Sequence, residues 1–89
     1  MSDRYKISER IVSREVDDGI VLINLDSGFY YSFNGTACFI FNMLKKDKDT
    51  AEVVDELKAE FDISEEEARD DLKKFIGTLE KEEIVSRLS

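Results

Sequence analysis

The sequence predicts an α+β fold in which a three-stranded antiparallel β-meander is followed by three α-helices. Three short runs within residues 11–33 are rich in β-branched and aromatic residues, and two turn signals that contain glycine separate them. From residue 34 onward, apolar residues recur at helical spacing in three segments divided by polar runs. At 89 residues, with no proline, the chain is expected to form a single domain, residues 1–89, around one modest core.

The strands are expected at residues 11–16, 20–25 and 29–33. Asp18-Gly19 lies between the first two runs, and Asp-Gly between apolar runs predicts a hairpin turn with positive φ at both central residues. The second run is apolar at almost every position, which predicts that it is covered on both faces. A second turn at residues 26–28 reverses the chain, so the third strand is expected at an edge of the meander.

The first two helices are predicted from periodicity and from capping residues. Asn34 or Thr36 can cap the first helix by accepting a hydrogen bond from an unpaired amide of its first turn. This helix reaches Lys46 and is apolar around most of its circumference, so it is expected at the buried centre of the domain. The second helix begins at Asp49 or Thr50 and carries one apolar stripe.

The third helix is expected over residues 64–82. Ser64 and Glu67 predict a capping box at its start, in which each side chain bonds the backbone amide of the other residue. Ile84 and Val85 can pack as a short tail after the helix. The apolar stripe of this helix consists of Ala68, Leu72, Phe75, Ile76 and Leu79.

Charged pairs and one glycine also mark the third helix. Glu65 with Arg69, and Asp70 with Lys74, are expected as i,i+4 ion pairs that each add a few tenths of a kcal/mol. Gly77 lies inside the helix, where glycine costs about 1 kcal/mol relative to alanine. It is expected either to admit a close backbone neighbour or to be tolerated there.

Composition narrows the class of function. The chain has 21 acidic and 13 basic residues, a net charge of −8, and no clustered basic face, so nucleic acid is not expected as a partner. It has no histidine and a single cysteine, Cys38, so we expect no enzyme activity, no metal site and no cofactor. The opening residues are polar and no stretch reaches the roughly 20 apolar residues that span a bilayer. A cytoplasmic protein without membrane association is the default expectation.

One segment carries a family resemblance. Leu22-Ile23-Asn24-Leu25-Asp26-Ser27-Gly28-Phe29-Tyr30-Tyr31-Ser32-Phe33-Asn34-Gly35-Thr36-Ala37 resembles the signature of the PqqD-like family, in which a strand, an acidic glycine turn and an aromatic strand lead into a helix. The resemblance covers about residues 7–85. Phe41 stands where many relatives carry tryptophan. The pattern is similar to the broad family more than to its subgroup dedicated to pyrroloquinoline quinone.

The resemblance implies both a shape and a function. Members of the family are similar to winged-helix domains, with the sheet placed first in the chain. They are non-catalytic modules that bind the leader segment of a ribosomally made precursor peptide as an extra strand, beside the third helix. The implied partners are that leader peptide and a modifying enzyme, such as a radical-SAM enzyme, or a leader protease and a cyclase.

The third strand suits this role on physical grounds. An edge strand has unpaired amides and carbonyls that an extended peptide can satisfy, and residues 29–33 contain no lysine or proline to blunt the edge. Replacing Tyr31 with proline is therefore expected to abolish peptide binding. Arg69 and Lys73 are expected to meet acidic groups of the peptide from the third helix. The candidate peptide-binding residues are Phe29, Tyr30, Tyr31, Ser32, Phe33, Arg69, Leu72, Lys73 and Ile76.

Other interpretations remain open at this point. Each ring of the third strand, and Leu72, can be core alone, and Arg69 and Lys73 can belong to a solvated face. A winged-helix DNA-binding regulator would use the third helix, but residues 64–83 carry eight acidic and four basic residues, a net charge of −4 that phosphates repel. A scaffold or dimerising subunit of an enzyme complex is the other alternative, since an open edge strand also permits a homodimer.

Overall fold

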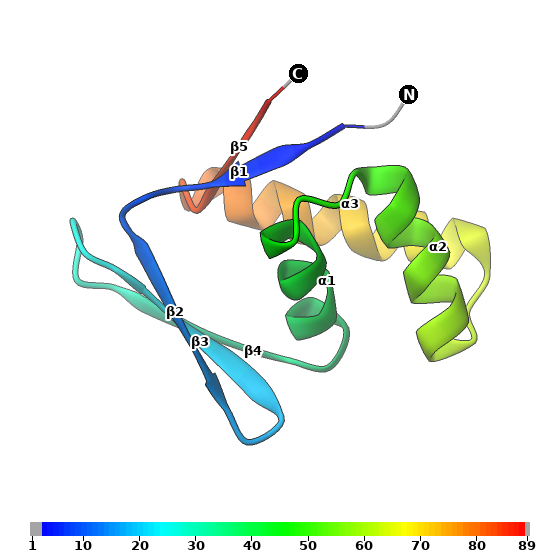
Figure 1. Cartoon of the computed structure of the whole chain (residues 1–89), viewed down its shortest axis with the longest axis horizontal. Coiled ribbons are helices and arrows are strands. Elements are labelled where there is room, and N and C mark those ends of the chain that lie inside the picture. The colour runs from blue at the N-terminus through cyan, green and yellow to red at the C-terminus, as the bar shows by residue number, and fades with distance from the viewer. Residues whose placement is uncertain (1–2, 89) are drawn as a thin grey trace.

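A computed structural model describes residues 3–88 of the chain (Figure 1). The predicted order of three antiparallel strands followed by three helices is confirmed, with one short strand added at each end. The elements in chain order are β1 (Tyr5–Ile7), β2 (Ile11–Val16), β3 (Gly19–Asn24), β4 (Tyr30–Asn34), α1 (Gly35–Lys45), α2 (Thr50–Phe61), α3 (Glu65–Lys81) and β5 (Val85–Arg87).

The three predicted strands form an antiparallel sheet in the order β2-β3-β4. The hairpin turn is one residue earlier than predicted, because Val16 pairs with Gly19 and the turn residues are Asp17 and Asp18. Asp17, rather than the glycine, takes a positive φ of 39°. Gly19 instead permits close approach of β4, since a Cβ atom there would lie 2.6 Å from the carbonyl oxygen of Phe33.

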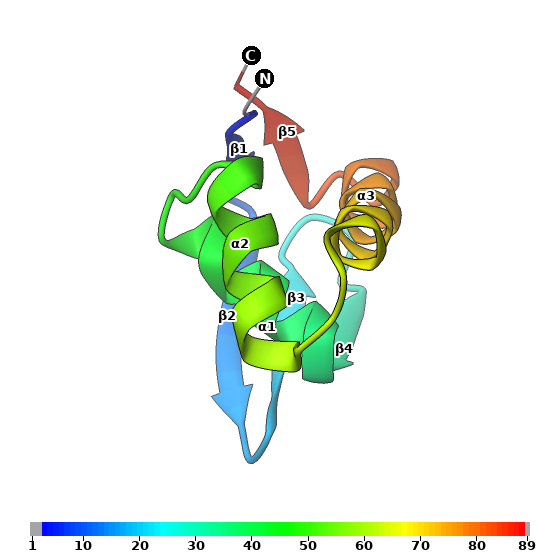
Figure 2. The same ribbon diagram turned by 90° about the vertical axis from the view of Figure 1, so that its right-hand side faces the viewer.

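The first and last strands pair with each other in a separate two-stranded antiparallel sheet. Tyr5 lies opposite Arg87, and Ile7 lies opposite Val85, so both ends of the chain lie side by side (Figure 2). Strand β1 was not predicted, because a three-residue strand is too short to show a periodic pattern. The expected tail is confirmed, since Ile84 and Val85 are both buried.

Helix α1 forms the centre of the molecule, between the β2–β3–β4 sheet and α2 (Figure 1). Ile40, Phe41, Met43 and Leu44 are buried along this short helix, as its nearly continuous apolar sequence predicts. These side chains join residues of every other layer in one hydrophobic core. Phe41 is the largest fully buried side chain, so an aromatic residue fills this position without tryptophan.

The outer face of β3 corrects one prediction. Ile20 and Leu22 point into the core and are fully buried, but Ile23 is 43% exposed. All the helices lie on one side of the β2–β3–β4 sheet, with α1 directly against it, so within residues 3–88 nothing covers the other face (Figure 1). An apolar run on both faces of a strand predicts two-sided cover, and here the chain supplies only one side.

Helix α3 is amphipathic and packs through one stripe of Ala68, Leu72, Ile76 and Leu79. Ile76, predicted both in this apolar stripe and as a candidate peptide-binding residue, is buried in the core. Phe75 is only partly buried at the border of the same stripe. None of the helices within residues 3–88 is both long enough and apolar enough to cross a membrane.

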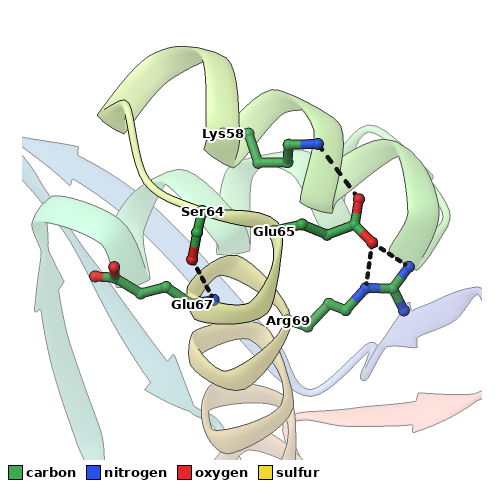
Figure 3. Close-up of polar contacts among 5 residues, drawn as sticks. All are labelled: Lys58, Ser64, Glu65, Glu67 and Arg69. Atoms are coloured by element: carbon green, nitrogen blue, oxygen red, sulfur yellow. Dashed lines mark hydrogen bonds and ion pairs between the residues drawn. The ribbon is translucent and has the colours of Figure 1, made fainter.

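The helix starts show which caps the sequence predicted correctly. Asn34 is the N-cap residue of α1, but its side chain makes no capping hydrogen bond. Asp49 and Glu52 form a complete capping box at α2. At α3, the Ser64 hydroxyl accepts a hydrogen bond from the Glu67 amide at 3.1 Å, which is half of the predicted box (Figure 3). Local hydrogen bonds therefore place α2 and α3 where the sequence indicates.

Candidate functional site

The open edge of β4 is the first component of the site. The strand order β2-β3-β4 leaves one edge of β4 without a partner strand within residues 3–88. The Asn24 amide donates to the Phe29 carbonyl at 2.9 Å, so this is a hydrogen-bonded pair of the β3–β4 ladder. Because such pairs alternate with non-bonded pairs, Tyr31 directs its backbone groups to β3, whereas Tyr30 and Ser32 direct theirs to the open edge.

This alternation in the direction of the backbone groups determines which proline substitution can test the open edge of β4. Proline at Tyr31 was expected to abolish peptide binding, but the amide of Tyr31 faces β3 and proline there would damage the sheet itself. The amides that a further strand can use belong to Tyr30 and Ser32. Ser32 is therefore the position at which proline removes an outward donor and leaves the β3–β4 ladder intact.

The side chains of this strand divide between two faces. Tyr31 and Phe33 point inward and are half-buried, so they contribute to the core and also remain accessible. Tyr30 is 73% exposed on the outer face, and Phe29 is 66% exposed just before the strand. Of these four rings, only those of Tyr31 and Phe33 belong to the core, and they are only partly buried there. No charged side chain interrupts the edge between residues 29 and 33.

Two contacts join β4 to helix α3. The rings of Phe33 and Phe75 meet edge to face, with centroids 5.0 Å apart. The Tyr31 hydroxyl donates a hydrogen bond to a carboxylate oxygen of Glu82, immediately after α3, at 2.8 Å. That hydrogen bond stabilises the protonated phenol and raises the pKa of Tyr31. The inward face of β4 is thus tied to α3 at two points.

A hollow of about 410 Å³ continues from the Phe33–Phe75 contact, between the start of α1 and the adjoining side of α3. We call it the β4-side cleft. Its apolar floor can contact an apolar side chain of a peptide, and its one lysine and one aspartate can contact a polar side chain. It is lined by Thr36, Ala37, Ile40, Asp71, Lys74, Phe75 and Thr78.

The four candidate residues of α3 lie elsewhere. Arg69, Leu72, Lys73 and Ile76 line a hollow of about 610 Å³ between α3, the first half of α2 and β1, which we call the α2-side hollow. At 100° per residue, the linings of the two hollows fall on opposite flanks of the buried stripe of α3. Arg69 and Lys73 therefore lie on the flank of α3 away from β4, whereas Leu72 and Ile76 are buried in the core against which Tyr31 and Phe33 pack.

An ion-pair network holds one end of the α2-side hollow. Glu65 accepts hydrogen bonds from Lys58 of α2 at 3.3 Å and from Arg69 at 3.1 Å (Figure 3). Lys58 and then Arg69 lower the pKa of the Glu65 carboxyl group. The predicted Glu65–Arg69 pair is confirmed. The predicted Asp70–Lys74 ion pair is not formed among the described residues, and Lys74 lines the β4-side cleft.

Comparisons with known proteins identify the family. The sequence profile described as Coenzyme PQQ synthesis protein D (PqqD) matches residues 19–85, most of the chain. This chain belongs to the PqqD family. The solved structure "TbiB1 in Complex with the TbiA(beta) Leader Peptide" is 31% identical to this PqqD-family chain and superposes with a TM-score of 0.88. The match covers 91% of this chain and 94% of TbiB1.

A second solved structure has the same fold. "Lasso peptide synthetase B1 complexed with the leader peptide" is 24% identical and superposes with a TM-score of 0.86, over 93% of this chain and 98% of the other. At that identity, the likeness establishes the shared fold. No curated protein matched this PqqD-family chain.

Sequence analysis missed four residues of α3 that lie at the β4-side cleft, namely Asp71, Lys74, Phe75 and Thr78. Phe75 was assigned to the core, and the others were treated as surface. Helical periodicity identifies the buried stripe of a helix, but the two flanks of that stripe look equivalent in sequence. The only signal in the sequence was a polar flank that contains threonine and has a partly apolar border. This signal did not indicate which strand the flank faces.

Proposed function

We propose that this PqqD-family chain is a non-catalytic recognition module of the cytoplasm that binds the leader segment of a ribosomally made precursor peptide. The leader pairs with the open edge of β4, and its side chains enter the β4-side cleft. The chain then presents the bound precursor to a modifying enzyme, such as a radical-SAM enzyme, or a leader protease and a cyclase. The open, uncharged edge of β4 beside α3 is the observation that carries the proposal.

Backbone pairing supplies affinity in this proposal. The amides and carbonyls of Tyr30 and Ser32 face away from β3, so an extended peptide satisfies them without any rearrangement of the sheet. Such pairing reads little sequence, because every peptide has the same backbone groups. Backbone pairing at the edge therefore supplies affinity, and specificity must come from another part of the site.

The β4-side cleft supplies that specificity. Alternate residues of an added strand point to the same face, so every second side chain of the leader faces Phe33 and Phe75. An apolar leader residue can pack on these rings, and an acidic neighbour can pair with Lys74. Two structures of the same fold, TbiB1 and a lasso peptide synthetase B1, are described as complexes with leader peptides, which supports this class of ligand.

Presentation of the peptide, without chemistry on it, agrees with the side chains available. The chain contains no histidine, and Cys38 is half-buried beside Asn42 in α1. The candidate residues on β4 are aromatic, with one serine and no base beside it in the described contacts. The module therefore binds through shape and backbone pairing.

An amide NMR titration with leader peptides encoded beside this gene tests the proposal. Saturable shifts are expected at Tyr30 and Ser32, and at residues 71–78 of α3. A well-folded sample that shows no shift with any of these peptides would favour a scaffold that binds the enzyme alone. Shifts with a short DNA duplex at low salt would instead favour the regulator alternative.

A further inference from the structure

Peptide binding at the edge of β4 leaves the outer face of the β2–β3–β4 sheet unused. Five of its side chains are large, apolar and exposed, including Val12 at 48% and Leu25 at 59%. Soluble proteins seldom leave such side chains together on one face unless the face binds something. We define the outer sheet face as Val12, Arg14, Val16, Ile23, Leu25 and Tyr30.

Strand register brings part of this face into one continuous row. Val12 lies opposite Ile23, and Ile23 lies opposite Tyr30, so three exposed apolar side chains cross the sheet side by side. The sequence of β3 already has the pattern of a strand that is covered on both faces. Residues 3–88 supply cover for the inner face only. The outer face therefore has the apolar composition of a buried surface, although its side chains are exposed.

Charge separates this face from the rest of the molecule. The outward positions of the three strands, residues 12, 14, 16, 19, 21, 23, 30, 32 and 34, contain no carboxylate, although the chain has 21 acidic residues. Arg14 is the single charged residue among them, and it makes no ion pair within residues 3–88. The face thus presents one unpaired positive charge within an apolar surface.

We infer that the outer sheet face is the docking surface for the enzyme that modifies the captured peptide, through an apolar patch on that enzyme with a carboxylate opposite Arg14. The naming of an enzyme as the partner rests on the proposed function. Tyr30 belongs both to this face and to the strand whose edge takes the leader, so an enzyme docked here lies directly beside the bound peptide.

A second copy of the chain fits this face less well. In a two-fold dimer both copies would contribute the same face, so two Arg14 side chains would be buried with no carboxylate from any outward strand position. An unpaired buried charge is strongly unfavourable, whereas a partner that supplies a carboxylate satisfies it. The charge pattern therefore selects a different protein over self-association.

The test measures two affinities separately for the full chain, one for each purified modifying enzyme encoded beside its gene and one for the leader peptide. Ile23→Lys places a charge in the middle of the apolar row, and Arg14→Glu reverses the outward charge. Lys46→Glu is the matched control for Arg14→Glu, because it also replaces a positive side chain with a negative one, at an exposed residue at the end of α1.

One neighbouring enzyme is expected to bind the wild-type chain. Ile23→Lys is expected to weaken that binding about 30-fold and Arg14→Glu about tenfold, while Lys46→Glu changes it less than about twofold. All three variants should keep the leader affinity of the wild type. Loss of enzyme binding with retained leader binding separates the docking surface from the peptide site.

Other results would overturn the inference. Equal enzyme binding by all variants removes the docking surface and leaves the proposed function intact. No enzyme binding by the wild type removes both the docking surface and the presentation step of the proposed function, and leaves leader recognition standing. A wild-type dimer in analytical ultracentrifugation that Ile23→Lys dissociates would assign the face to a second copy. Enzyme binding that depends on Ile23 in a chain that binds no leader would support the docking surface and contradict the proposed function.

Discussion

The two flanks of helix α3 differ in what they offer a ligand. The flank toward α2 lines the larger hollow, about 610 Å³, with Arg69 and Lys73 at its rim. The flank toward β4 lines a smaller hollow, about 410 Å³, with Lys74 and Phe75. Only the smaller hollow adjoins an uncharged strand edge whose free amides and carbonyls point outward.

The difference shows that volume alone does not identify a peptide site. An extended peptide brings a polar backbone with it, and burying that backbone without hydrogen bonds costs about 1–3 kcal/mol for each unsatisfied group. The edge of β4 removes this cost, because Tyr30 and Ser32 provide matching groups. The α2-side hollow lies beside β1 and the helices α2 and α3, and β4 does not line it.

The largest expected effect comes from the edge itself. Ser32→Pro removes an outward amide from β4 and should lower leader affinity by about 2 kcal/mol, roughly 30-fold, in calorimetric titration. The fold should persist, because proline is tolerated on edge strands where its missing N–H faces solvent. Ser13→Pro is the matched control, since the bond from the Leu25 amide to the Arg10 carbonyl places the Ser13 amide on the opposite edge. Equal affinity of both variants would mean that the leader does not pair with β4.

The aromatic contact at the cleft gives the next effect. Phe75→Ala removes the edge-to-face contact with Phe33 and should reduce both the free energy of unfolding and leader affinity by about 1–2 kcal/mol each. Phe61→Ala is a control, because its ring makes a similar contact with Phe39, at 5.4 Å, away from β4. It should lower stability in urea denaturation and leave leader affinity unchanged. Similar loss of affinity in both variants would indicate a general loss of stability.

Charge reversal compares the two flanks of α3 directly. Lys74→Glu should weaken the binding of an acidic leader by about 0.5–1 kcal/mol, because an exposed ion pair contributes little. Lys73→Glu changes the charge equally on the other flank and should have no effect. The double variant Arg69→Glu, Lys73→Glu tests the sequence-based prediction that these two residues meet the leader. A loss of about 1–3 kcal/mol in that variant would place the leader across the α2-side hollow.

The smallest effect is expected at the ion-pair network of Glu65. Its pKa is lowered by Lys58 and Arg69, so the network stabilises the fold above the carboxyl group's ordinary value of about 4.5 and is lost as the pH falls through the folded-state pKa. Glu65→Gln should lower the melting temperature slightly at pH 7 and not at pH 2, with leader affinity unchanged at pH 7. A difference in melting temperature that persists at pH 2 would assign the effect to something other than this charge.

The sequence predicted most of the fold because its signals are local. Turn residues predicted the strand boundaries to within one residue, and Asp49 and Ser64 marked the starts of α2 and α3. It also identified β4 as an edge, since three strands in a meander leave the third one outermost. The candidate residues on β4 follow from that position. Those on α3 required a choice between two flanks of one stripe, and the sequence contains no signal for that choice.

By itself, the sequence determined the order of the three meander strands and the three helices, the starts of α2 and α3, the apolar stripe of each helix and the uncharged edge strand. Each of these depends on residues a few positions apart. Tertiary structure alone decided that β1 pairs with β5, that Gly19 makes room for β4, and that Phe75 rather than Arg69 faces that strand. It also decided which face of the sheet the helices leave open. These features depend on contacts between residues far apart in the chain, which local propensity and periodicity do not encode.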